Sequence, residues 1–506
     1  MEALFSAAVG ELVSRCLSFL ISRYPSMPEL SKVESLRKLE RALLRIAITV
    51  EEAEGRLITN KAMLQQLKML RQEMHKGYYV LDKFRYLDQE EGKVSGRRSC
   101  SSLALPSTSN PGKRFPPSAS RRHGRKELEV TLDSVQNMFT DMYEFVAFLK
   151  NSPPMFCQPY SMYLLFERCM FGRQAEMERT IYFLLQREPP GDFTLGVLPI
   201  IGRGKVGKTT LVEHVCDDER VRHHFSQIVF FSGNKFVEEK LATLMDGGII
   251  KHKSKTQNAG RMLVIVELDE DVEEGAWRRL LSASRGCLPS GSKIIVTSRS
   301  EKIMNFGTTQ ALRLNFLTRE ACWYFFKVLV FGSTYAEDQP KHASIAMEIF
   351  EEYYCHNDLL GDFTGSFANS KNIAALLRAN ASMQHWRRIL ACVRRNGHQN
   401  LLPCSADTND VRVENGHYYI CRISNISQYV QVDRHHRVVR LDDEEAPNIT
   451  IDEVMYGRVT PKGKFEAVWW RSHLPPHYKY ITTCEIHDSK CMDGREKSSR
   501  KRKSLS

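Results

Sequence analysis

The sequence predicts a multidomain protein with an N-terminal helical bundle, a central α/β domain with a helical extension, and a small C-terminal β-rich domain. Three observations predict this fold class. Apolar residues recur at three- and four-residue steps over residues 1–91. Four short apolar runs alternate with helix-length segments between residues 161 and 317, and the first precedes a glycine-rich loop. Strand-like runs separated by turn formers fill residues 405–490.

The first domain, residues 1–91, is predicted to be a small antiparallel bundle of helices. Its first apolar stripe includes Phe5, Val9, Leu12 and Leu20, and two further stripes follow after Pro25 and Pro28. The charged side chains within residues 1–24 exclude a signal peptide and an ordinary membrane span there, so we expect no transmembrane segment.

The net charge of +12 lies in two segments outside the predicted folded domains. Residues 92–126 carry nine basic and no acidic residues, and their Ser/Pro/Arg-rich composition predicts a disordered linker. A helix and a second linker follow at 127–160, and a basic tail occupies 491–506. Because both basic segments lie outside any predicted folded groove, we expect no sequence-specific nucleic-acid binding. A nuclear import signal and a solvated tail both account for residues 499–504.

The cysteines predict a reducing compartment. The chain has 13 cysteines, none of which forms a C-x-x-C pair or has zinc-type spacing with histidine. Such scattered cysteines are typical of reduced thiols in cytosolic or nuclear proteins. We therefore expect a cytoplasmic protein, with nuclear location through the basic tail as the alternative.

Residues 202–210 read GRGKVGKTT, which is the spacing of a phosphate-binding loop. An apolar run at 194–201 precedes the loop and an apolar helical pattern follows it, so residues 161–317 are predicted to be a P-loop NTPase domain. The glycines turn backbone N–H groups toward phosphate, Lys208 reaches the β- and γ-phosphates, and Thr209 binds Mg²⁺. The predicted ADP/ATP-binding residues of the loop are Gly202, Gly204, Lys205, Val206, Gly207, Lys208, Thr209 and Thr210.

Hydrolysis needs an acidic side chain at the end of a neighbouring strand. Glu267 is the first acid after the apolar run at 262–266, and Asp269 follows two positions later. Either Glu267 holds the metal, or Asp269 does so at a bulged strand end, or these acids only solvate a loop. Because Leu268 interrupts the acid pair, we expect ATP hydrolysis to be weak or absent. Arg299 ends another apolar run and is predicted to contact the γ-phosphate, with a surface arginine as the alternative.

Five blocks in order resemble the NB-ARC domain of plant intracellular immune receptors, a domain of the STAND ATPase class. They are FGRQAEMERTIYFLL, GRGKVGKTTLVEHVCDDERVRHHF, LVIVELDEDVEEGAWRRL, SGSKIIVTSRS and LTREACWYFFKVLVFG. The first block resembles the segment that helps to hold adenine, which implies that Gly172 and Arg173 bind the nucleotide. The first 150 residues resemble the coiled-coil domain of such receptors, and residues 318–400 are expected to form a helical subdomain.

The chain departs from the family pattern at several positions. Lys205 replaces the usual glycine of the loop, and Glu267-Leu268 replaces the acid pair. We find neither the family's Gly-Leu-Pro-Leu-Ala block nor its Met-His-Asp block, and no leucine-rich repeats follow. The β-rich residues 405–490 take the place of the expected winged-helix subdomain.

The resemblance implies an ADP/ATP-binding protein of plant innate immunity that acts as a nucleotide-dependent switch in defence-response signalling. Its N-terminal helices would bind protein partners, either another receptor of the class or a second copy of the chain. The alternative is a hydrolysis-deficient interaction module or adaptor derived from such a receptor, in which the nucleotide is only structural.

Overall fold

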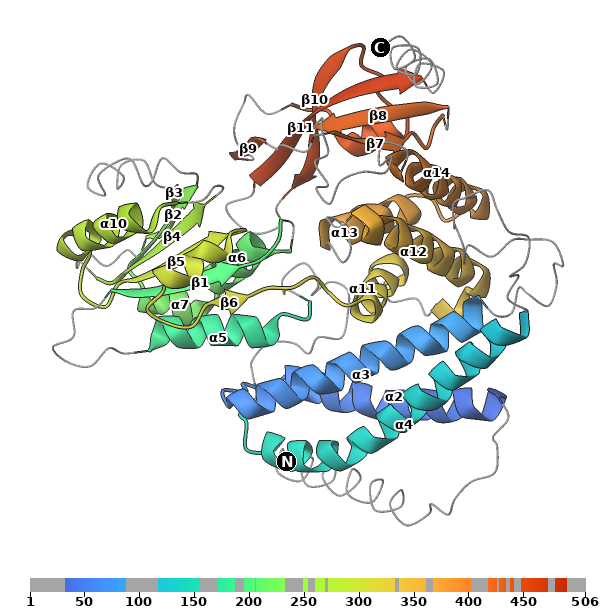
Figure 1. Ribbon diagram of the computed structural model, residues 1–506, viewed down its shortest axis with the longest axis horizontal. Helices are drawn as coiled ribbons and strands as arrows, with labels where there is room; N and C mark the ends of the chain where they lie inside the picture. The colour runs from blue at the N-terminus through green and yellow to red at the C-terminus, as the bar shows by residue number, and fades with distance from the viewer. Residues whose placement is uncertain are drawn as a thin grey trace, which may run out of the picture. The chain divides into compact units, whose positions relative to one another are not determined.

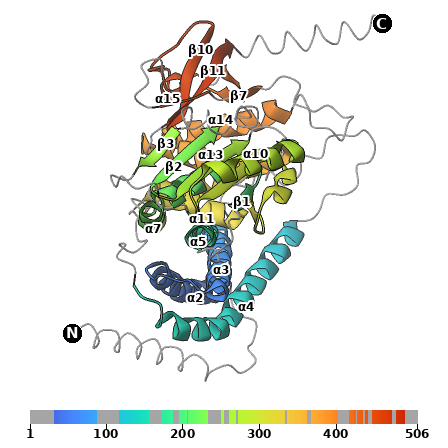
Figure 2. The same cartoon turned by 90° about the vertical axis from the view of Figure 1, so that its left-hand side faces the viewer.

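The computed structural model falls into two compact units, Met1–Ser161 and Met162–Ser506 (Figures 1 and 2). The predicted helical stripe of residues 5–21, Lys205, Asp269 and the basic tail lie outside the residues that the structure describes. The described residues are 32–87, 117–154, 171–186, 195–204, 206–232, 249–253, 260–268, 272–332, 336–360, 367–401, 417–425, 427–433, 437–440, 447–471 and 478–488.

The first unit contains three long helices, α2 (Lys32–Glu54), α3 (Lys61–Tyr86) and α4 (Pro117–Leu149), each of which packs against the other two. Apolar residues at three- and four-residue steps fill the core between them, as the sequence pattern predicts. Asn60 caps α3, because its side chain accepts hydrogen bonds from the backbone N–H groups of Ala62 and Met63. The N-terminal region is therefore a helical bundle over its described residues.

A polar cluster lies inside this apolar bundle. Arg71 forms an ion pair with Glu54 at 2.7 Å, and both side chains are largely buried. Burial raises the pKa of the Glu54 carboxyl, although the attraction of Arg71 opposes this shift. Burial also lowers the pKa of His75 to about 3, and the nearby Arg71 charge adds to the shift. His75 is therefore neutral at physiological pH.

The start of α4 corrects one prediction from composition. Residues 117–126 were predicted to be the end of a disordered linker, but α4 begins at Pro117. Proline is favoured at the first position of a helix, where its fixed φ and its missing N–H cost nothing. Ala and Arg, which have high helix propensity, then extend the amphipathic helix toward its N-terminus. Composition alone predicts too short a helix, because the apolar residues that hold α4 against the bundle lie after residue 126.

The second unit contains a six-stranded sheet in the order β3-β2-β4-β5-β1-β6. The four predicted strands are β1 (Gly196–Ile201), β2 (Gln227–Ser232), β4 (Met262–Leu268) and β5 (Lys293–Ser298), and they pair in parallel. Two short edge strands were not predicted: β6 (Leu312–Arg313), which is parallel to β1, and β3 (Ile249–Lys253), which is antiparallel to β2. The central domain is therefore an α/β sheet typical of a P-loop NTPase.

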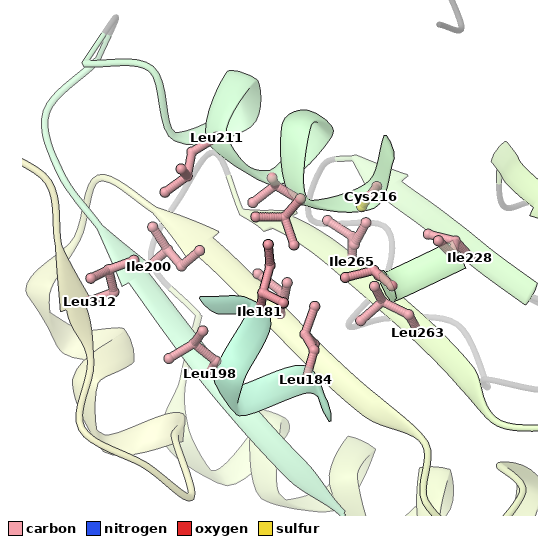
Figure 3. Close-up of a cluster of buried hydrophobic side chains, with 14 of the residues drawn as sticks. Ile181, Leu184, Leu198, Ile200, Leu211, Cys216, Ile228, Leu263, Ile265 and Leu312 are labelled. Carbon is pink, nitrogen blue, oxygen red and sulfur yellow. The ribbon is translucent and has the colours of Figure 1, made fainter. Parts of the chain in front are cut away.

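Helices cover both faces of this sheet. On one face, α5 (Gln174–Leu185), α6 (Lys208–Asp217) and α7 (Glu219–His224) share a buried apolar cluster with alternate residues of β1, β2 and β4 and with Ile295 of β5 (Figure 3). On the other face, α10 (Glu274–Cys287) and the 3-10 helix η2 (Glu301–Phe306) pack on the intervening residues. Strands buried on both faces explain why their sequences are continuously apolar.

Helices α11 (Arg319–Phe331), α12 (Pro340–Leu360), α13 (Phe367–Arg378) and α14 (Met383–Leu401) follow the sheet, with the short 3-10 helix η3 (Ala336–Asp338) between the first two. A C-terminal antiparallel sheet comes next, in the order β10-β11-β8-β7, with β9 also paired to β11. Its elements are β7 (His417–Cys421), β8 (Gln428–Asp433), β9 (Arg437–Arg440), α15 (Ile451–Met455), β10 (Lys464–Arg471) and β11 (Tyr478–Asp488). A capping box between Thr450 and Glu453 starts α15, which the strand pattern did not predict.

Gly77 is expected to hold α2 and α3 at their present separation. A Cβ at this position would lie 2.4 Å from Leu43 Cδ2, so Gly77→Ala is expected to destabilise the bundle by about 1–3 kcal/mol through overpacking. A loss of stability would be evidence of close packing, because replacing a glycine with alanine normally stabilises a helix by about 1 kcal/mol. Hydrogen exchange of α3 peptides would localise the loss of stability.

Gly55→Ala is the control, because its Cβ would meet only atoms 3.6 Å or more away. Equal protection in the two variants would contradict the prediction.

Candidate phosphate-binding site

The loop between β1 and α6 has a backbone that requires glycine at two positions. Gly207 caps the N-terminus of α6 with φ +94°, in the left-handed region. Gly202 donates its N–H to the Ser298 carbonyl at 3.3 Å, and a Cβ there would lie 2.6 Å from the Leu314 carbonyl oxygen. These two glycines hold the loop close to the ends of β1 and β5. The loop therefore leads directly into the positive end of a ten-residue helix.

Lys208 lies folded into this loop. Its ammonium donates hydrogen bonds to the carbonyl oxygens of Gly202 at 2.7 Å and Arg203 at 3.1 Å, and the residue is only 8% exposed. Burial lowers the pKa of Lys208 to about 8, with the Glu267 carboxylate opposing this shift and Arg299 adding to it. A cation that loses hydration in this way gains from an anionic ligand at the same place.

Thr209 and Glu267, the two predicted metal ligands, lie within hydrogen-bonding distance of each other. The Thr209 hydroxyl donates to Glu267 Oε1 at 2.8 Å, although the two residues come from α6 and β4. A hydroxyl and a carboxylate are oxygen ligands of the kind that Mg²⁺ prefers. Their chemistry and spacing fit a magnesium ion beside the loop. Sequence reasoning named both residues but could not give their contact.

The remaining residues of the predicted loop differ in role. Val206 is 1% exposed and packs in the apolar cluster beneath α6, so it anchors the loop. Arg299 is exposed at the end of β5, and its guanidinium lies over Gly204, where an added Cβ would come 3.4 Å from Arg299 Cζ. Thr210 is half-buried in the first turn of α6. Arg299 is thus at the edge of the loop, as a phosphate-contacting side chain would have to be.

Gly172 and Arg173, the predicted adenine-side residues, precede α5. Gly172 has φ +67°, and a Cβ there would lie 3.5 Å from Leu317 Cδ2. Arg173 is buried, donates a hydrogen bond to the Asn315 carbonyl and lies 3.9 Å from Glu176 Oε1. Burial lowers the pKa of Arg173, and the Glu176 carboxylate opposes this shift. The Arg173 guanidinium therefore ties the start of α5 to the segment after β6.

Thr297 is a residue of this site that the sequence reasoning missed. It lies near the end of β5, where it pairs with Glu267 on β4 and with Ile200 on β1. It is 2% exposed, and its hydroxyl has no hydrogen-bond partner among the described residues. The only sequence signal is a hydroxyl inside an apolar strand, which β-propensity explains equally well.

Comparison with known proteins agrees with the NB-ARC resemblance predicted from the sequence motifs. Residues 173–336 match the family model of the NB-ARC domain. The chain is 23% identical to disease resistance protein RGA2 of Solanum bulbocastanum over 69% of this chain and 36% of that protein. It is 26% identical to putative disease resistance protein RGA1 of the same species, over 45% of this chain and 23% of that protein. It is also 26% identical to putative disease resistance RPP13-like protein 1 of Arabidopsis thaliana, over 45% of this chain and 22% of that protein.

These matches confirm the resemblance to plant NB-ARC proteins of disease resistance. The chain spans no more than 36% of the length of these relatives. Among the described residues, no helix is both long enough and apolar enough to cross a membrane.

The lowered pKa of Lys208 predicts a pH dependence of phosphate binding. Because only the ammonium form attracts phosphate, affinity for ADP is expected to fall above a pH of about 8, reaching roughly tenfold weaker binding by a pH of about 9. Over the same window the unfolded chain, whose lysine pKa is higher, binds more protons, so nucleotide-free stability should rise with pH. Titration calorimetry of wild type and Lys208→Arg would check this, since arginine stays charged throughout. A parallel decline in both proteins would show that another group titrates.

Proposed function

We propose that this chain is an ADP/ATP-binding protein of plant defence-response signalling that acts as a nucleotide-dependent switch. The observation that carries the proposal is the contact of Thr209 with Glu267 beside Lys208, at the N-terminus of α6. The loop thus brings together the buried Lys208 ammonium, the Thr209 and Glu267 oxygens that could bind a metal ion, and the N-terminus of a helix, whose first N–H groups have no partner within the helix. The match of residues 173–336 to the NB-ARC domain supports the nucleotide as the ligand.

The residues of the loop have separable tasks in this proposal. The backbone N–H groups of Gly204, Gly207 and Lys208 would cradle the phosphates, and Lys208 would exchange the Gly202 and Arg203 carbonyls for phosphate oxygens. Arg299, over Gly204, is placed to contact the terminal phosphate. Thr209 and Glu267 would hold Mg²⁺, which supplies positive charge to the phosphate oxygens when bound.

Hydrolysis is proposed to be weak because the acid pair of the family is not intact. Glu267 is the only acidic residue in the described part of β4, and its Oε1 is directed to Thr209 on the metal side. Orienting an attacking water needs a second group beyond the metal ligands. If no second group orients a water molecule for hydrolysis, the alternative function applies, in which the chain is an interaction module and the nucleotide is only structural. In both cases the N-terminal helices are proposed to bind protein partners, either a related receptor or a second copy.

Nucleotide binding is expected to depend on Lys208. Wild-type protein should contain ADP after purification and bind it with micromolar or tighter affinity, whereas Lys208→Ala should lose about tenfold or more. The measurement is nucleotide content by chromatography together with an ADP titration. Lys341→Ala, which removes an exposed lysine at the start of α12, is the control and should bind as wild type. No bound nucleotide, with equal titrations of all three proteins, would reject the proposal.

Single-turnover hydrolysis separates the switch from the structural alternative. With ATP bound to excess protein, we expect slow ADP formation in wild type and none in Glu267→Gln, because glutamine keeps the shape but loses the charge that holds the metal. The affinity of the variant for ADP in EDTA should match that of wild type, which shows that the loop itself is intact. Identical time courses for the two proteins would favour the interaction module.

A further inference from the structure

Thr297 has a hydroxyl that the fold alone does not use. Its β5 neighbours Ile294, Ile295 and Val296 are wholly buried and apolar. A buried hydroxyl without a hydrogen bond costs free energy, whereas valine has the same shape and no such cost. A chain selected only to fold would gain from valine at this position. Because Thr297 also lies between Ile200, next to the phosphate loop, and Glu267, a ligand at this loop is placed to complete its hydrogen bonds.

The sheet register places this hydroxyl beside Glu267. Residues paired across parallel strands lie about 4.8 Å apart and direct their side chains to the same face. Ile295, two residues before Thr297, belongs to the cluster beneath α6 together with Ile265, two residues before Glu267. Thr297 and Glu267 therefore both face α6, where Glu267 already reaches the Thr209 hydroxyl. On its other side Thr297 adjoins Ile200 of β1, the strand that leads into the phosphate loop.

We propose that Thr297 is a positioning residue for the metal–nucleotide complex, and that its hydroxyl bonds a water molecule in the coordination shell of Mg²⁺. This inference rests on the proposed function. Mg²⁺ in proteins usually keeps several water ligands, and these need partners beyond the direct ligands. A hydroxyl both accepts and donates, so Thr297 can accept from such a water and donate to the Glu267 carboxylate. Glu267 would then be oriented by Thr297 when Thr209 turns its oxygen toward the ion.

The test compares Thr297→Val with Thr297→Ser. ADP affinity is titrated against Mg²⁺ and again in EDTA, and the melting temperature is measured without nucleotide. For Thr297→Val we expect the Mg²⁺ concentration for half-maximal enhancement of ADP binding to rise about tenfold. Its ADP affinity in EDTA should equal that of wild type, and its nucleotide-free melting temperature should be unchanged or higher. Thr297→Ser, which keeps the hydroxyl, should retain the wild-type Mg²⁺ dependence.

Thr131→Val is the matched control. Thr131 on α4 is also a buried threonine without a hydroxyl partner among the described residues, but it belongs to the other unit. It should leave the Mg²⁺ dependence unchanged. The inference is overturned if Thr297→Val keeps the wild-type Mg²⁺ dependence, weakens binding equally in EDTA, or melts earlier, or if Thr297→Ser fails to retain the wild-type behaviour. Failure of wild type to bind ADP, or indifference to Lys208→Ala, would instead reject the proposed function itself.

Discussion

The parallel register of β4, β5 and β1 is the constraint on which the candidate site depends. It sets Glu267, Thr297 and Ile200 side by side, although they are far apart in sequence. Because β5 separates the other two strands, a shift of one residue in its pairing would turn Thr297 to the opposite face and move the hydrogen bond between Gly202 and Ser298. The continuously apolar strands hold this register through two buried clusters, one on each face of the sheet. The site is thus positioned by predominantly apolar packing on both faces of the sheet.

Two side chains of the site lower the folding stability of the protein. Lys208 has lost hydration and is held by two carbonyl oxygens, and its pKa falls to about 8. Thr297 has a buried hydroxyl without a partner among the described residues. A bound polyphosphate with its metal would reverse both costs, since it brings negative charge and hydrogen-bonding oxygens. Local costs of this kind are common where a protein holds a ligand.

The sequence predicted the parts of this fold whose signal is local and strong. β1, β2, β4 and β5 were predicted because strands buried on both faces are continuously apolar. β3 and β6 were not, because β3 contains Lys251 and His252 on an edge and β6 has only two residues. The phosphate-loop spacing predicted Lys208 and Thr209, but the contact of Thr209 with Glu267 required the register. Thr297 could not be predicted, since only its lack of a partner in three dimensions distinguishes it from a strand residue.

The C-terminal sheet is hydrogen-bonded to the helices that follow the central α/β domain. The Tyr456 hydroxyl donates to the Leu376 carbonyl at 2.9 Å, and the Cys392 thiol of α14 lies 3.8 Å from the Arg422 carbonyl. Arg422 is itself buried, with its Nε donating to the Val454 carbonyl at 3.0 Å. Separating the sheet from the helices would break the Tyr456 and Cys392 contacts, which costs free energy, whereas the Arg422 guanidinium is bonded within the C-terminal domain. Any displacement of α13 and α14 would therefore carry the sheet with it.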